Sequence, residues 1–459
     1  MTLMGVLEDS YTSTEEDPLH GSLQGSGASP SAWLFISIQL IKALTKIAQC
    51  VEFYNPDKSI KISSTMDGFV DDKTGGVNDQ AREIPMTKRE LRDHLKKDAQ
   101  SWEKLLFSSG GTLELKKCFY YLATWKWDVE GEATLETPEE QQGQGIDQLQ
   151  MTSGNATTTT PITHLAPSKG HRTLGVRLAL DGNMDMEFDF VKKKADKLAT
   201  GLFASKISRF DARLAKGSSV KSSLSYSLVA TTFTYDQCGK IDSLIRRALL
   251  AKTGFNRNLP KVIAHGPAIL GGLNRMNVYT EQAVSKITFV LAQIRHQTQL
   301  GSQILIALQY DHLITGLSQP TLMDPTYVPH REESFFVVLT NFLRDNGLQI
   351  YLPTMKACKP QRRHDVCIIE RLMESNLLSK RPTAMKRFNR CRLYLQVTFL
   401  SELCNGSGTA IATSYFDGTH PSDSAALDPT GPARTAKLEN LETRPAPTLS
   451  SEAQSPQRP

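Results

Sequence analysis

Two adjacent aspartates, Asp71 and Asp72, are the residues whose type and spacing most directly suggest chemistry in this sequence. Carboxylate oxygens are the ligands that Mg²⁺ prefers, and the ion keeps several waters that substrate phosphates can replace. A pair of such ions can hold both the attacking and the leaving oxygen of a phosphoryl transfer. A helix cap or a solvated turn is the commoner explanation of an Asp-Asp dipeptide, so the neighbouring segments decide between the two.

The elements around the aspartates can be predicted from the spacing of apolar residues. Ser29-Pro30 opens a helix expected over residues 30–50, and a strand–turn–strand centred on Asp67-Gly68 is expected over 59–74. A second helix is expected over 87–106, with its apolar face formed by every third or fourth residue, and Gly110-Gly111 ends it. Residues 113–127, rich in aromatic side chains, are expected to be β-like.

A glycine-rich segment at residues 23–30 precedes the first helix. Its glycines allow the backbone to approach a ligand closely, and the side chains of Gln24 and Ser26 can contact a base or a sugar. The segment is not a P-loop, because no Gly-Lys-Ser/Thr follows. A loop that only caps the helix is the alternative interpretation.

Taken in order, these segments resemble the palm of reverse transcriptases of the retrotransposon type. Residues 23–30 resemble the palm motif that contacts the template and the incoming nucleotide, and Phe69-Val70-Asp71-Asp72 resembles the Tyr/Phe-x-Asp-Asp motif. Residues 110–118 resemble the following motif, whose lysine faces the nucleotide phosphates, with Lys117 as the better match. Residues 172–177 resemble the Leu-Gly hairpin that grips the primer end.

The resemblance implies an α+β fold: a partial right-hand polymerase palm, a mainly helical thumb-like region and a disordered tail. The implied activity is template-directed nucleotidyl transfer by an RNA-directed DNA polymerase. Asp71 and Asp72 would bind Mg²⁺, and Lys117 would offset phosphate charge. The implied substrate-binding residues are Gln24, Gly25, Ser26, Gly27, Ser29, Phe69, Leu174 and Gly175.

Composition and the resemblance together predict the following segments. They are a frayed start at 1–20, a partial palm at 21–185 with a flexible insertion at 130–161, a thumb-like helical region at 186–315, a mixed α-rich region at 316–405, and a disordered tail at 406–459.

The sequence departs from the family pattern in two ways. Polymerases of this type carry a third metal-binding aspartate upstream of the glycine-rich loop, whereas only 23 residues precede Gln24 here, and they have no strand character. We therefore expect the chain alone not to polymerise, unless a separate chain supplies the missing part. Lys73, directly after the pair, could compete electrostatically with a metal ion at Asp72.

Basic residues gather in three runs, which predict a nucleic-acid partner (RNA template or DNA primer) bound through its phosphates. The net charge of the chain is +5, and the runs lie at residues 192–221, 246–261 and 380–392. Solvated helix faces are the alternative explanation. A nucleic-acid-binding remnant without chemistry, and a remnant without a stable fold, are the competing hypotheses for the whole chain.

The remaining composition predicts an intracellular protein, cytoplasmic or nuclear, with no membrane partner. Seven cysteines lie far apart without a Cys-x-x-Cys pair, so we expect free thiols. The longest apolar stretch, at residues 33–51, is broken by lysine and glutamine and does not resemble a membrane span.

Overall fold

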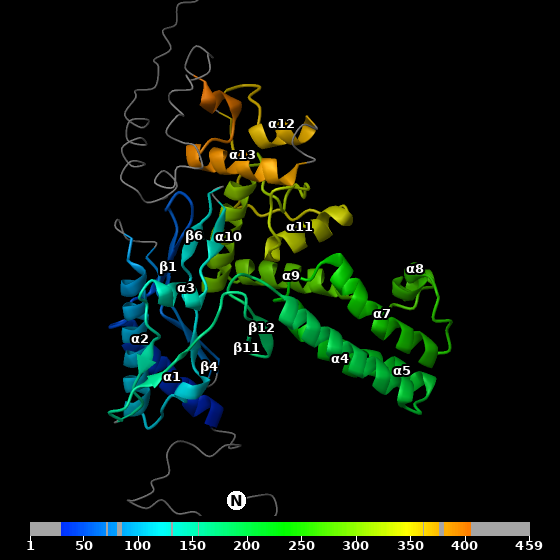
Figure 1. The fold of residues 1–459 in the computed structure, drawn as a ribbon. Helices are drawn as coiled ribbons and strands as arrows, with labels where there is room; N and C mark the ends of the chain where they lie inside the picture. The colour runs from blue at the N-terminus through cyan, green and yellow to red at the C-terminus, as the bar shows by residue number, and fades with distance from the viewer. Residues whose placement is uncertain are drawn as a thin grey trace, which may run out of the picture. The chain divides into compact units, whose positions relative to one another are not determined.

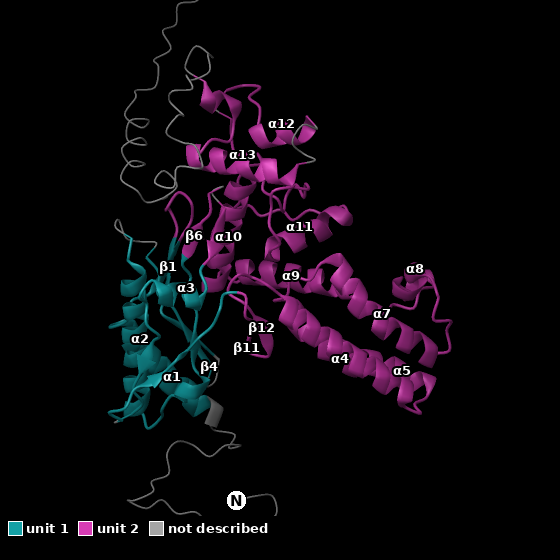
Figure 2. Cartoon of the chain, viewed as in Figure 1, with its two compact units in different colours: residues 1–53, 61–124, 136–167 teal, residues 54–60, 125–135, 168–459 magenta. Residues whose placement is uncertain are grey.

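The computed structural model describes residues 29–69, 72–79, 85–129, 132–154, 156–360, 362–375 and 381–404, without the side chains of residues 29, 30 and 69. Over these residues the fold is mixed α/β with helices predominating (Figure 1). Every sheet formed by the described residues is a pair of two short strands. The chain divides into two compact units: unit 1 comprises residues 1–53, 61–124 and 136–167, and unit 2 the rest (Figure 2).

Unit 1 consists of two long helices, short strand pairs and connecting turns. Its elements are α1 (Ser29–Thr45), β1 (Val51–Tyr54), β2 (Lys61–Ser64), β3 (Met66–Phe69), β4 (Asp72–Gly75), α2 (Lys88–Ser108), η1 (Leu115–Lys117), β5 (Phe119–Tyr120), α3 (Pro138–Gly143), β8 (Gln150–Met151), β9 (Thr160–Pro161) and β10 (Thr163–His164). The pairs are β1 with β2, β3 with β4, β5 with β10 and β8 with β9.

Both predicted helices of unit 1 are confirmed. The helix α1 ends at Thr45, five residues before the predicted end, and residues 46–48 continue it as turns. The helix α2 starts with a capping box, in which Thr87 and Glu90 each accept the backbone N–H of the other. It ends next to Gly110, whose φ of 86° is left-handed, so the predicted glycine stop is also confirmed.

The apolar face of α2 packs into two separate clusters. Its C-terminal residues Trp102 and Leu106 pack with Leu40 and Leu44 of α1, and Met66 of β3 lies against the same cluster. Its N-terminal part packs against a second cluster of buried residues: Leu115, Tyr120, Leu122, Ile146, Leu149, Met151 and Ile162. One helix therefore supports both the aspartate-bearing hairpin and the following segments of unit 1.

The segment 130–161, predicted to be a flexible insertion, instead contributes ordered structure over its described residues. It includes β7 (Ala133–Leu135), α3, β8 and β9, and it supplies Ile146, Leu149 and Met151 to the core of unit 1. These three apolar residues are few in a segment dominated by Gln, Gly and Thr, so composition concealed them. Thr137 caps α3 with a second capping box.

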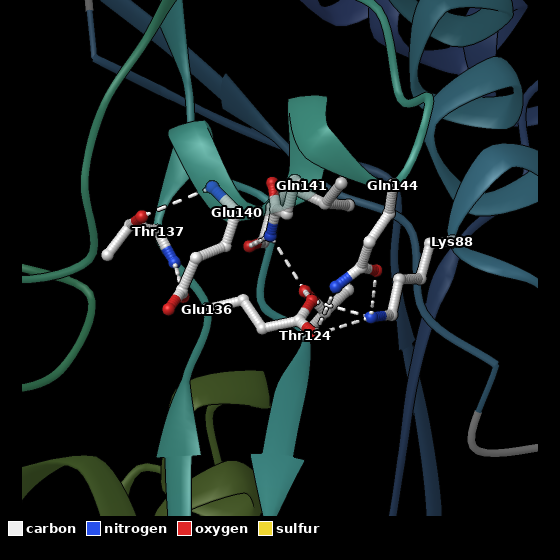
Figure 3. Close-up of polar contacts among 8 residues, drawn as sticks. Lys88, Thr124, Glu136, Thr137, Glu140, Gln141 and Gln144 are labelled. Carbon is white, nitrogen blue, oxygen red and sulfur yellow. Dashed lines mark hydrogen bonds and ion pairs between the residues drawn. The ribbon is translucent and has the colours of Figure 1, made fainter.

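A buried carboxylate ties this segment to α2 (Figure 3). Glu136 is 3% exposed and accepts hydrogen bonds from Lys88 Nζ at 2.6 Å, Thr124 Oγ1 at 2.5 Å and Gln144 Nε2 at 3.1 Å. Burial acts to raise the pKa of Glu136, but the hydrogen bonds from Lys88, Thr124 and Gln144 outweigh it and hold the pKa below its ordinary value of 4.5.

Glu103 of α2 plays a similar part for two loops. Its side chain, 1% exposed, accepts the backbone N–H of Leu113 at 2.8 Å and of Gly154 at 2.9 Å.

Two amide side chains of unit 1 form paired hydrogen bonds with the backbone in or next to a strand. Asn78 both donates to and accepts from the backbone of Glu52 in β1, and Gln100 does the same with Thr152 next to β8.

Unit 2 is mainly helical. Its elements are β6 (Trp125–Trp127), β7, β11 (His171–Thr173), β12 (Val176–Leu178), α4 (Asp185–Ala204), α5 (Arg209–Ala215), the π-helical turn η2 (Lys216–Lys221), α6 (Ser222–Leu228), α7 (Tyr235–Lys252), α8 (Lys261–His265), η3 (Ala268–Leu270), α9 (Val278–Arg295), α10 (Gln299–Thr315), α11 (Phe335–Asp345), α12 (Ile368–Glu374), α13 (Pro382–Leu395) and η4 (Leu400–Leu403).

The helices α4 and α7 lie side by side and share a core with α6 and α9 (Figure 1). A second cluster joins α9, α10 and α11, and a third includes residues of α12 and α13. Gln282 of α9, fully buried, donates to and accepts from the backbone of Phe233, which places the start of α7. The predicted tail at 406–459 lies outside the described residues.

The cysteine prediction is confirmed, because all seven thiols are free. Among the described residues, no helix is long and apolar enough to cross a membrane.

The lowered pKa of Glu136 predicts an acid-labile contribution to the stability of unit 1. The ionised carboxylate stabilises the fold above its unfolded-state pKa, and this contribution is lost as the pH falls through the lower folded-state value. Urea unfolding followed by tryptophan fluorescence, to which the buried Trp102 of unit 1 contributes, should show stability falling from about pH 6 to pH 3 in the wild type. Glu136→Gln should be less stable at neutral pH and show a smaller fall.

Lys88→Met is the matched control, because it leaves Glu136 buried without its cation. Burial then raises the folded-state pKa of Glu136 toward or above its unfolded value, so this variant should be less stable at neutral pH and lose less stability than the wild type as the pH falls. An unchanged pH dependence in Glu136→Gln would contradict the assignment.

Candidate active site and nucleic-acid interface

The aspartate motif lies at the end of the β3–β4 hairpin. Phe69 pairs with Asp72, and the preceding pair is Gly68 with Lys73. Residues 70 and 71 connect the strands and lie outside the described residues, so Asp71 has no described position. The strand–turn–strand prediction is confirmed, but its turn was misplaced, because Asp67 and Gly68 lie within β3.

Lys73 lies on the opposite face of the hairpin from Asp72, because successive side chains of a strand alternate between faces. Its side chain crosses Gly68, where an added Cβ would lie 2.6 Å from Lys73 Nζ, and Nζ lies 5.8 Å from the centroid of the Trp33 ring of α1. The predicted competition between Lys73 and a metal ion at Asp72 is therefore reduced by geometry. A side chain at position 68 would displace the flexible end of Lys73 from this path.

The face that carries Asp72 is acidic. Asp67 and Phe69 alternate with Gly68, so Asp67 projects on the same face as Asp72, and both aspartates are exposed. Exposed carboxylates are suitable donors for a hydrated Mg²⁺ ion. Among the described residues, to which Asp71 does not belong, no group of three or more His, Cys, Asp or Glu side chains is arranged to hold a metal.

Lys117 ends the short turn η1 and is exposed, while Leu115 of the same turn is buried in the core of unit 1. The burial of Leu115 therefore anchors the turn, while the side chain of Lys117 remains exposed to solvent. No hydrogen bond or ion pair joins Lys117 to Asp72, although both are described. Gln24, Gly25, Ser26 and Gly27 lie outside the described residues, and Ser29 is the first residue of α1.

Leu174 and Gly175 form the turn between β11 and β12 in unit 2. Thr173 pairs with Val176, so the loop has two residues, and both have positive φ, 49° for Leu174 and 89° for Gly175. Such a turn matches the twist of a hairpin, but the left-handed conformation strains a leucine by about 1–2 kcal/mol. The leucine is 41% exposed, so burial of its side chain does not offset this strain fully.

Two contacts that the sequence analysis missed hold this hairpin in place. Glu187 of α4, 1% exposed, accepts the backbone N–H of Arg177 at 2.9 Å, and Tyr226 Oη donates to the carbonyl of Leu174 at 2.6 Å. Tyr226 follows Leu174 by 52 residues, so no local sequence pattern could have revealed the pairing.

The first basic run keeps most of its cations exposed. They lie on α4, on α5 and next to these helices: Lys192, Lys193, Lys197, Lys206, Arg209, Arg213 and Lys221. Lys194 and Lys216 instead donate to backbone carbonyls, and Lys221 pairs with Glu281 at 2.8 Å. Burial, together with the charge of Arg275, lowers the pKa of Lys216.

The other two runs are partly or largely used inside the fold. In the second, Arg246 pairs with Asp242 and Lys252 donates to the Ser205 carbonyl, which leaves Arg247, Arg257 and Lys261 exposed. In the third, Lys386 and Arg390 both pair with Glu132 of the β6–β7 connection. Arg392 is 2% exposed, and burial lowers its pKa to about 10. The third run is therefore mainly structural.

Relief of the strain at Leu174 gives a direct test of the hairpin geometry. Asparagine adopts left-handed backbone readily, so Leu174→Asn should stabilise the hairpin by about 1 kcal/mol. Hydrogen–deuterium exchange of the β11 and β12 amides should slow in this variant. Gly175→Ala places a Cβ on a residue at φ 89° and should have the opposite effect. Faster exchange in Leu174→Asn would show that the leucine side chain itself stabilises the turn.

Comparison of the chain with protein-family models, with curated proteins and with solved structures finds no match. No fold family or activity is therefore assigned to the chain by similarity, and its function has to be inferred from its motifs and from the geometry described above.

Proposed function

We propose that the chain is part of an RNA-directed DNA polymerase of the retrotransposon type, and that unit 1 contains the aspartate-bearing part of its palm. The observation that carries this proposal is that Phe69 and Asp72, the first and last residues of the Phe-Val-Asp-Asp motif, form the last pair of a hairpin that lies between α1 and α2 in the sequence. Met66 of the hairpin lies against the cluster in which α1 packs on α2. A metal-binding motif needs this kind of rigid support.

The residues of the chain would divide the work as follows. Asp71 and Asp72 would hold Mg²⁺, which supplies charge neutralisation at the phosphates when bound. Lys117 would offset the charge of the incoming nucleotide, and the Gln24–Ser29 segment would position the template and the nucleotide. Leu174 and Gly175 would seat the primer end. The exposed face of Asp72 and the turning of Lys73 to the other face both favour a metal site there.

A second candidate function is nucleic-acid binding without chemistry. The exposed cations of α4 and α5 favour it, because no carboxylate of the described residues pairs with them, and they can meet phosphates independently of Asp71 and Asp72. Such binding is insensitive to sequence and weakens steeply with salt. The two functions share a nucleic-acid partner and differ in whether the aspartates matter.

The deciding experiment combines primer extension with metal binding. The purified chain, with a primer annealed to an RNA or a DNA template, is titrated with Mn²⁺ as a paramagnetic substitute for Mg²⁺. We expect bound Mn²⁺ in the wild type and its loss in the Asp71→Asn, Asp72→Asn double variant, with primer–template affinity kept. Asp147→Asn, an exposed aspartate outside the hairpin, should leave Mn²⁺ binding unchanged.

We expect no extension by this chain alone, because only two of the implied metal-binding aspartates are identified in it. Extension that the double variant abolishes would support the polymerase and show that the two aspartates suffice. Equal Mn²⁺ binding in the wild type and the double variant, with salt-sensitive primer–template binding, would contradict the metal site and favour the second candidate.

A further inference from the structure

A cleft in unit 2 lies between the start of α7 and the end of α11. Its volume is about 160 Å³, and its lining includes Tyr235 of α7, Tyr279 of α9, and Asn341, Arg344 and Asp345 of α11. Sites for drug-sized ligands measure roughly 300–1,000 Å³, so this cleft has room for a single ring system. None of the polymerase-like motifs includes these residues.

Tyr235 offers an aromatic surface at the rim of this cleft. Its side chain is 61% exposed, although a large aromatic ring normally gains by burial. The ring is held by an edge contact with Tyr279, at 5.2 Å between centroids, and Tyr279 makes a similar contact with Phe342 at 5.5 Å. Tyr279 Oη also donates to Asp345 at 3.2 Å. Tyr235 therefore stands on a fixed aromatic base.

The rest of the lining is polar and carries one uncompensated negative charge. Arg344 donates to Asp345 at 3.0 Å and to the Asn341 side chain at 3.0 Å, and its guanidinium lies 5.6 Å from the centroid of the Tyr327 ring. The ion pair with Asp345 cancels the charge of Arg344, which leaves Glu333 as the remaining charge of the lining. This carboxylate would repel a phosphate, so the cleft favours an uncharged or cationic group over an anionic one.

We propose that this cleft binds one nucleobase of a single-stranded segment of nucleic acid. A base is flat, uncharged and rimmed by hydrogen-bonding groups, which matches an aromatic platform opposite amide, carboxylate and guanidinium groups. The proposal rests on nucleic acid being the partner of the chain, as both candidate functions require. The cleft would contact the base itself, whereas the cations of α4 and α5 would contact only the backbone phosphates.

The test uses the full chain and two single-stranded RNA oligonucleotides of equal length, one with bases and one abasic throughout, with binding measured by fluorescence anisotropy at fixed salt. Tyr235→Ala should bind the base-bearing oligonucleotide roughly five- to 150-fold more weakly, and the abasic one as the wild type does. Tyr235→Phe keeps the ring and should bind both as the wild type does. Tyr351→Ala, which removes a similarly exposed tyrosine outside the lining, is the matched control.

Each alternative outcome overturns the proposal in a distinguishable way. Unchanged binding of the base-bearing oligonucleotide by a folded Tyr235→Ala variant would refute the cleft and leave nucleic-acid binding intact. Equal weakening on both oligonucleotides would assign the cleft to the backbone. Binding of an arginine-rich peptide that depends on Tyr235, while RNA binding does not, would assign it to a protein partner. Absence of RNA binding by the wild type would contradict the shared partner as well.

Discussion

Short strand pairs cannot hold themselves together in water, and this constraint explains much of the side-chain chemistry in the structure. Each sheet of the described chain has only two strands. Buried glutamates replace the missing neighbours: Glu103 and Glu136 fix loops and turns of unit 1, and Glu187 fixes the β11–β12 hairpin. A carboxylate can accept several hydrogen bonds at once, so one side chain satisfies donors that a third strand would otherwise satisfy.

The candidate site depends on these supports because its motifs lie on hairpins and turns rather than on helices. In the β3–β4 hairpin, the apolar contact of Met66 and the packing of Lys73 over Gly68 toward α1 help to orient Asp72. The strained backbone of Leu174 is maintained because Tyr226 donates to the Leu174 carbonyl and Glu187 accepts the N–H of Arg177 in β12. Strain maintained by surrounding contacts is a feature of functional sites.

Local signals in the sequence predicted the helices well and the connections between them poorly. The capping threonine and the glycine stop of α2 are encoded within a few residues, as is the two-residue loop at Leu174. The order in segment 130–161 depends on Ile146, Leu149 and Met151, whose core partners, among them Leu115 and Leu122, lie more than 20 residues earlier in the sequence. The use of Arg390 and Arg392 inside the fold was hidden for the same reason, since their partners Glu132 and Leu313 lie far away in sequence.

The paired hydrogen bonds between the Asn78 side chain and the Glu52 backbone can be lost by a slow covalent change of the asparagine. Asn78 offers Glu52 one N–H and one oxygen, and this pairing requires an amide. Deamidation, the slow hydrolysis that converts asparagine to aspartate, would replace the donor by a second oxygen facing the Glu52 carbonyl. The strand β1 would then lose a neighbour and gain a repulsion with no change in the gene. Gln100 makes the equivalent pair with Thr152 next to β8, and because glutamine deamidates much more slowly than asparagine, that pair would outlast the one at Asn78.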